Sequence, residues 1–218
     1  MRLDEILRLA EGRGIPVRFK KGLDLDRVLP GIAHQGIVAL SGEFAYSELE
    51  DILGISLGGP EHALVLAADH ITDEGNLGAL IRTAAFFGAH GLILPRDRSA
   101  SVTERVVKRS SGALVHLPVA RVVNLARTLD ISREKGFWII GAAGESDESI
   151  YDFDWQRDLI LILGSEGRGL GHTIRGRCHQ LLSIPRTGSV ESLNVSVAAG
   201  VILSEIIRQR GKGGGKGS

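Results

Sequence analysis

The chain has 218 residues, of which 43% are hydrophobic and 24% charged, and 26 basic residues balance 26 acidic ones. This length suffices for one domain and part of a second. No apolar run approaches the ~20 residues that cross a bilayer, and the N-terminus lacks the pattern of a signal peptide. We therefore expect a soluble, cytoplasmic protein with no membrane partner. The single cysteine, Cys178, excludes an intrachain disulfide and lacks zinc-site spacing, so no metal is predicted.

The first part of the chain contains few elements. The pattern predicts a helix over 3–12, a strand over 15–19, a second helix starting near Asp24 and a strand over 36–42. These elements are too few for an independent core. We interpret residues 1–58 as a partial α/β N-terminal domain that ends in a glycine-rich linker.

From residue 59 onward, apolar runs alternate with helical periodicity. This alternation is typical of parallel strands joined by crossover helices, so residues 59–210 are predicted to form an α/β domain. The predicted strands lie within 63–71, 91–95, 114–122, 137–144, 158–167 and 180–185. The predicted helices lie within 76–88, 102–112 and 124–135, with a short helix after Gly169 and a final helix to Arg210. The glycine-rich tail, 211–218, is expected to be disordered.

Three glycine-containing loops follow predicted strands, at 141–145, 164–171 and 184–194. Ligands of open α/β sheets bind beyond the carboxyl ends of the strands, and glycines let the backbone approach them closely. In the second loop, Glu166 stands where a dinucleotide fingerprint requires glycine and would repel phosphate, which argues against a nucleotide-dependent oxidoreductase. Glu166 suits a cationic ligand such as S-adenosylmethionine; alternatively, it is a helix-start residue favoured by the helix dipole.

Four other polar residues have both a structural and a functional interpretation. Asn76, at the mouth of the first crossover helix, either caps that helix or faces a ligand. Arg82 follows among apolar neighbours, where a charge is costly unless it is paired or lies in a site. Ser192 either caps the final helix or faces a pocket together with Asn194. That helix is apolar nearly all round, so we expect it to be buried against the sheet.

Residues 96–109 form a locally basic stretch. Its five cations are Arg96, Arg98, Arg105, Lys108 and Arg109. The stretch is either a solvated helix face or a surface that contacts RNA phosphates.

Three segments together resemble the ordered signature motifs of SpoU-type RNA ribose methyltransferases. They are NLGALIRTAAFFGA with Asn76, Gly78 and Arg82, LILILGSEGRGL with Gly164, Glu166 and Gly169, and IPRTGSVESLNVSVAAG with Ser192 and Asn194. The resemblance spans roughly Ala63 to Arg210. It implies a SPOUT-type parallel sheet with a C-terminal trefoil knot, a homodimer with its active site near the subunit interface, and S-adenosylmethionine as cofactor.

The resemblance also implies the reaction and the residues that carry it. Methyl transfer to a ribose 2′-hydroxyl would use Asn76, Arg82, Glu166, Ser192 and Asn194, which we expect to meet around a single cofactor. The cofactor itself would be held by Ala143, Gly144, Leu163, Gly164, Ile184 and Leu193.

The N-terminal part bears on the RNA substrate. AHQGIVA, residues 33–39, resembles the closing portion of an RNA-binding domain in the subgroup that methylates a guanosine of 23S ribosomal RNA. The resemblance implies that the chain begins inside that domain and that the basic stretch binds ribosomal RNA. Transfer RNA is the alternative substrate. A non-catalytic RNA-binding or ribosome-assembly protein of the same fold is the alternative from another functional class.

Overall fold

The structure, a computed structural model, describes residues 3–28, 30, 34, 36–40, 42–54 and 62–213. The chain divides into two compact units, Met1–Glu43 and Phe44–Ser218. Within the described ranges, no helix is long and apolar enough to cross a membrane.

The first unit contains two helices, α1 (Leu3–Gly12) and α2 (Gly22–Val28), as predicted. The predicted strand over 15–19 is wrong, and the described residues of 36–42 form no strand either. A strand requires a hydrogen-bonding neighbour, and the apolar side chains of these segments are exposed instead, Phe19 to 79% and Leu40 to 86%. Ala10 is the one buried residue among those described in this unit.

Residues 44–54 belong to the second unit, whereas the sequence prediction assigns them to the N-terminal part. The N–H of Ser47 donates to the carbonyl of Val119 at 2.9 Å. The hydroxyl of Tyr46 accepts the N–H of Val102 at 2.9 Å. The short helix α3 (Leu49–Gly54) buries Ile52 in the core. The predicted linker lies largely outside the described residues.

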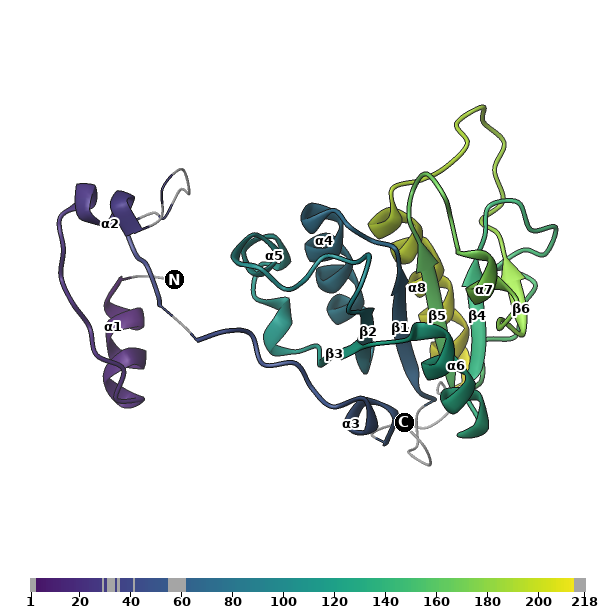
Figure 1. Ribbon diagram of the computed structural model, residues 1–218, viewed down its shortest axis with the longest axis horizontal. Coiled ribbons are helices and arrows are strands. Elements are labelled where there is room, and N and C mark those ends of the chain that lie inside the picture. The colour runs from purple at the N-terminus through teal and green to yellow at the C-terminus, as the bar shows by residue number, and fades with distance from the viewer. Residues whose placement is uncertain are drawn as a thin grey trace. The chain divides into compact units, whose positions relative to one another are not determined.

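A six-stranded parallel sheet forms the centre of the second unit (Figure 1), and its order is β3-β2-β1-β5-β4-β6. Its strands are β1 (Leu64–Asp69), β2 (Gly91–Pro95), β3 (Val119–Val122), β4 (Trp138–Ala142), β5 (Leu159–Gly164) and β6 (Gln180–Leu182). The connecting helices are α4 (Glu74–Phe86), α5 (Glu104–Ser110), the short 3-10 helix η1 (Ala113–Val115), α6 (Leu125–Glu134), α7 (His172–Arg175) and α8 (Val195–Gly213). The predicted α/β fold with a parallel sheet is confirmed.

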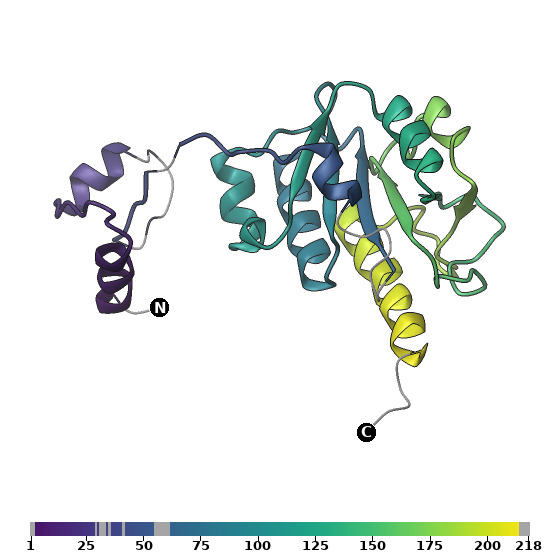
Figure 2. The ribbon, with the colours of Figure 1, turned by 90° about the horizontal axis from the view of Figure 1, so that it is seen from below.

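Helices cover both faces of this sheet, as Figures 1 and 2 show. Along β1, Leu64 and Leu66 join the apolar cluster beneath α4, α5 and α8. Val65 and Ala67 join the opposite cluster with α3, α6 and α7. Side chains of a strand alternate between faces, and a parallel sheet buries both, which explains the continuous apolar runs in the sequence.

The final helix is longer than predicted. It continues three residues beyond Arg210 to Gly213, so the first part of the glycine-rich tail is helical. Residues 214–218 lie outside the described ranges. The side chain of Arg210 ties this end of α8 to the sheet, because it donates to the carbonyls of Ala63 and Arg157 at 3.1 and 2.8 Å.

Candidate functional site

The carboxyl ends of β4, β5 and β6 open into a pocket of about 640 Å³. All six residues predicted to hold a cofactor line it: Ala143, Gly144, Leu163, Gly164, Ile184 and Leu193. Two of the predicted catalytic residues, Glu166 and Ser192, line it as well. The three glycine-containing loops of the sequence therefore converge on one cavity, at the sheet edge where α/β proteins bind ligands.

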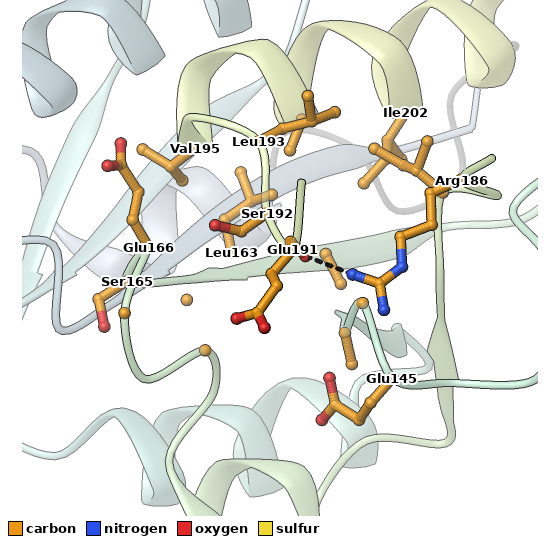
Figure 3. A pocket seen from close by; sticks show the side chains of 18 of the residues that line it. Glu145, Leu163, Ser165, Glu166, Arg186, Glu191, Ser192, Leu193, Val195 and Ile202 are labelled. Atoms are coloured by element: carbon orange, nitrogen blue, oxygen red, sulfur yellow. Dashed lines mark hydrogen bonds between the residues drawn. The ribbon is translucent and has the colours of Figure 1, made fainter. Parts of the chain in front are cut away.

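The pocket combines apolar walls with carboxylates. Figure 3 shows Leu163, Val195 and Ile202 along its wall, with Glu166 at one end and Glu145 and Arg186 at the other. The sequence prediction did not select Glu145, although it is the last residue of the glycine-containing loop over 141–145. Its carboxylate pairs with the guanidinium of Arg175, and this hydrogen bond is the main reason why the pKa of Glu145 lies below its usual value.

The loop over residues 164–171 folds tightly back on itself. The N–H of Gly169 donates to the carbonyl of Ser165 at 2.8 Å. A Cβ at position 164 would lie only 2.2 Å from the carbonyl carbon of Gly169, and Gly169 itself has φ +62°. Both positions therefore require glycine, one for space and the other for its backbone conformation.

Asn76, Glu166 and Asn194 form what we call the amide–carboxylate network. Glu166 Oε1 accepts hydrogen bonds from Asn76 Nδ2 at 2.9 Å and from Asn194 Nδ2 at 2.5 Å. Asn194 Nδ2 also donates to Asn76 Oδ1 at 2.8 Å. One residue from each of the three signature segments is thus joined to the others at the rim of the pocket.

Helix capping explains how the two asparagines are oriented. Asn76 does not cap α4; Asp73 does, because Asp73 Oδ1 accepts the Asn76 N–H at 2.7 Å. Asn194, and not Ser192, caps α8, since its Oδ1 accepts the N–H of Ser196 at 3.0 Å. With Oδ1 committed to the helix, the amide nitrogen of Asn194 is directed at Glu166.

Arg82 lies in a second hollow, apart from the pocket. We call this the cationic hollow, because Arg82, Arg105, Lys108 and Arg109 line it together with Ser111, and these four cations outnumber the two carboxylates in its lining, Asp73 and Glu74. Arg82 is exposed, and its Nη1 donates to Ser111 Oγ at 3.3 Å. Arg82 follows Asn76 by six residues on α4. This spacing rotates its side chain about the helix axis by about 120° relative to that of Asn76, so the two side chains face different directions. The described chain does not bring Arg82 into the cleft that holds Glu166.

The predicted basic stretch divides into two groups. Arg105, Lys108 and Arg109 line the cationic hollow with Arg82. Arg96 and Arg98 instead follow the carboxyl end of β2, where the carbonyl of Arg96 accepts Arg121 Nη2 at 3.0 Å. The turn between β2 and α5 separates the two groups.

Cys178 belongs to the packing of the domain. Its thiol donates to the carbonyl of Ile174 at 3.4 Å, and burial raises its pKa to about 11. A thiol that stays protonated is a poor nucleophile and metal ligand. The described residues contain no group of three or more His, Cys, Asp or Glu side chains that could hold a metal ion.

Comparison with known protein families gives one match that covers most of the chain. A model described as the SpoU rRNA Methylase family matches residues 63–204. These residues include all six strands of the sheet and all three members of the amide–carboxylate network.

Individual relatives agree with this match. The chain is 39% identical over 206 residues to YacO of Bacillus subtilis, named as a TrmH family tRNA/rRNA methyltransferase, covering 94% of this chain and 82% of that protein. It is 43% identical over 209 residues to a protein of Mycobacterium avium named as an uncharacterized tRNA/rRNA methyltransferase, covering 96% of this chain and 67% of that protein. A crystal structure of the SpoU methyltransferase AviRb from Streptomyces viridochromogenes, in complex with AdoMet, superposes with a TM-score of 0.69 at 34% identity and covers 77% of this chain and 66% of that one.

Proposed function

Because the chain belongs to the SpoU rRNA methylase family, we propose that it transfers a methyl group from S-adenosylmethionine to a ribose 2′-hydroxyl of RNA. The observation that carries this proposal is the amide–carboxylate network, which unites one polar side chain from each signature segment at a pocket between glycine-containing loops. The structural relative with 34% identity binds AdoMet, which supports the same cofactor here.

The pocket fits this cofactor by size and chemistry. Its volume, about 640 Å³, lies within the usual range for small-molecule sites. Leu163 and Ile202 offer apolar contact for an adenine ring, and backbone at Gly144 is open to close approach. When bound, S-adenosylmethionine supplies a methyl group on a positively charged sulfur. The carboxylates of Glu145 and Glu166 suit that charge better than they suit a phosphate.

Within the network, Glu166 is the residue that we propose faces the cofactor. Both asparagine amides bind its Oε1, so among the described contacts its Oε2 remains available to a cationic ligand. The two amides hold the carboxylate in place. It therefore need not reorient when the charge on the bound ligand changes during the reaction. Ser192, in the adjoining wall, would help to shape the site.

Arg82 is the residue that we propose acts on the RNA. A neutral ribose hydroxyl is a poor nucleophile, so the enzyme must stabilise the negative charge that develops on its oxygen or remove its proton. A guanidinium remains protonated in proteins and binds phosphate in a planar, bidentate fashion. We therefore favour charge stabilisation and phosphate anchoring over a role as general base, with Arg105, Lys108 and Arg109 extending the phosphate-binding surface.

We further propose a homodimer with its active site near the subunit interface. Within one chain the cationic hollow and the cofactor pocket do not coincide. The apolar side chains of Leu193, in the pocket lining, and of Val197, in the first turn of α8, are 46% and 50% exposed. A second copy that covers this surface would reduce that exposure and could complete the site with its own Arg82.

The finer assignments rest on the motif resemblance. We propose that the C-terminal part of the sheet domain forms a trefoil knot and that the enzyme acts in the cytoplasm. The proposed substrate is a guanosine of 23S ribosomal RNA, bound in part by the N-terminal unit and by Arg96 and Arg98. The names of the relatives include both tRNA and rRNA.

The test is a transfer assay with labelled S-adenosylmethionine and separate pools of ribosomal and transfer RNA. We expect label in 23S ribosomal RNA, at a phosphodiester that resists alkaline cleavage because its 2′-oxygen is methylated. Label in transfer RNA alone would replace the proposed substrate. Cofactor and RNA binding without any transfer would favour the non-catalytic RNA-binding protein, and label on a base rather than a ribose would overturn the proposed reaction.

A further inference from the structure

Asp69, the last residue of β1, is a buried carboxylate that does not line the pocket. It is 2% exposed, and both of its oxygens are bound. Oδ2 accepts the backbone N–H of Gly171 at 2.7 Å. Oδ1 lies 2.6 Å from His70 Nδ1, which donates, because a carboxylate can only accept. Burying a carboxylate is costly, so its two bonds must be strong for it to persist here.

The position of Asp69 links the two ends of the loop that carries Glu166. Its backbone pairs in register with Gly164, where the loop begins. Its side chain binds Gly171, where the loop ends. Gly171 is the N-cap residue of α7, and its N–H, which has no partner within that helix, is bound by the carboxylate of Asp69, 102 residues away in the sequence. A single residue of the central strand therefore closes the loop.

The neighbouring turn reaches the other side of the network. His70 has φ +60°, a conformation that a residue with a side chain rarely adopts. Such strain persists only where the surroundings impose it, and the bond to Asp69 is such a constraint. The turn at His70 leads directly to the Asp73 cap and to Asn76. Asp69 thus stands between the segment that supplies Asn76 and the loop that supplies Glu166.

We infer that Asp69 is a positioning residue for the cofactor site: its buried carboxylate, bound to Gly171 and His70, fixes the 164–171 loop so that Glu166 meets Asn76 and Asn194. This inference rests on the proposed function, since the site that it positions is the proposed cofactor pocket. Asp69 acts through the loop and not by contact with the ligand. Substitution of Asp69 should therefore weaken cofactor binding more than it slows the chemical step.

The test compares two substitutions at this position with a matched control. Asp69→Asn keeps the size of the side chain but removes its charge, and Asp69→Ala removes both bonds. Glu205→Gln is the control, because Glu205 is a carboxylate of similar burial, 4% exposed, whose bonds to Arg208 and Gln209 lie within α8. Calorimetry gives the Kd for S-adenosylmethionine, steady-state kinetics separate KM from kcat, and hydrogen exchange reports the Gly171 amide.

We expect the cofactor Kd and KM to rise about tenfold for Asp69→Asn and about a hundredfold for Asp69→Ala, with kcat changed by less than about threefold. Exchange at Gly171 should accelerate in the same order. Glu205→Gln should lower the Tm and leave the Kd unchanged.

Unchanged cofactor affinity in a folded Asp69→Asn protein, or an equal loss in Glu205→Gln, would overturn the positioning role. If the unaltered chain binds no S-adenosylmethionine, the proposed function fails first, and the inference falls with it. Because Asp69→Asn preserves shape, it decides the question even if Asp69→Ala does not fold.

Discussion

The cofactor pocket and the cationic hollow, both in the second unit, differ in the contacts that orient their central polar side chains, Glu166 and Arg82. In the pocket, Glu166 accepts two amide hydrogen bonds, and Asn194 is held in turn by the helix that it caps. In the hollow, Arg82 makes one long bond to a hydroxyl, and Arg105 lies 3.9 Å from the carboxylate of Glu74. Hydrogen bonds among its own residues orient the carboxylate of the pocket, whereas the hollow gathers four cations at a surface that suits a negatively charged ligand.

The contrast indicates which property each region should lose on mutation. A preorganised site depends on geometry, so small steric changes in it should be severe. A site that binds through charge depends on ionic strength and on the number of cations. The following predictions test that distinction.

The largest effect is expected for Gly164→Ala. The new Cβ would lie 2.2 Å from the backbone of Gly169, which cannot move aside as a flexible side chain could. We expect cofactor binding to fall more than about a hundredfold. Gly167→Ala, in the same loop, is the control, because a Cβ there meets nothing within 4 Å. Comparable losses in the two variants, measured by calorimetry, would show that the loop is not sterically defined.

Arg82→Ala should lower kcat by about a hundredfold or more, because it removes the charge proposed to stabilise the reacting oxygen. Cofactor affinity should stay nearly unchanged, since Arg82 does not line the pocket. Arg82→Lys should also be poor, because an ammonium lacks the planar fork of a guanidinium. Single-turnover kinetics with bound RNA measure this step, and retained turnover in Arg82→Ala would reject the assignment.

The same variant tests the dimer. If a second copy completes the site, mixing inactive Arg82→Ala chains with inactive Glu166→Ala chains should restore part of the activity. If no activity returns although subunit exchange has been verified, both residues act in the active site of one chain.

Reversal of the charges of Arg105, Lys108 and Arg109 to Glu should weaken RNA binding roughly 30-fold and reduce the slope of log affinity against log salt by about 3. The cofactor Kd should not change. Filter binding over a range of salt concentrations measures the slope. Reversal of Arg133 and Lys135, at the C-terminal end of α6, provides the control. An unaltered slope would remove the hollow from the RNA surface.

Asn194→Asp should weaken cofactor binding by about tenfold, because it retains the helix cap but sets a second carboxylate against Glu166. Asn124→Asp is a matched control: Asn124 caps α6 by accepting the N–H of Arg127 at 3.0 Å, away from the pocket. It should leave affinity unchanged. Equal Kd values for the two variants would show that the amide of Asn194 contributes nothing to the pocket.

The smallest effect concerns pH. Arg175 lowers the pKa of Glu145, so this carboxylate stays ionised to lower pH than a free glutamate. The contribution of the Arg175–Glu145 pair to stability is fully present above the ordinary glutamate pKa. It is lost as the pH falls through the lowered pKa of Glu145. Arg175→Gln removes the pair, so it should raise the pKa of Glu145 towards its usual value and let this carboxylate lose its charge at higher pH, with a few-fold change in cofactor affinity. NMR titration of the Glu145 carboxyl checks the direction.

Much of the fold could be predicted because its signals are local. Alternating apolar runs and helical periodicity located all six strands, and glycines after three of them indicated the ligand loops. The strand predictions over 15–19 and 36–42 were wrong because they, too, rested on local signals alone. An apolar run indicates a strand only if a neighbouring strand exists to pair with it, and local sequence does not contain that information.

The candidate site shows the same contrast between what local sequence signals predict and what depends on the whole fold. From local patterns alone, the sequence predicted Asn76, Glu166 and Asn194 as site residues, and the structure joins these three by hydrogen bonds. Three features of the site are visible only in the folded domain. Glu166 accepts hydrogen bonds from both asparagines, Arg82 lies in a separate hollow, and Asp69 binds Gly171, 102 residues away in the sequence. The rotation of each helix and the order of the strands set which of these side chains meet. Both depend on packing across the whole domain, and no short segment of sequence specifies that packing.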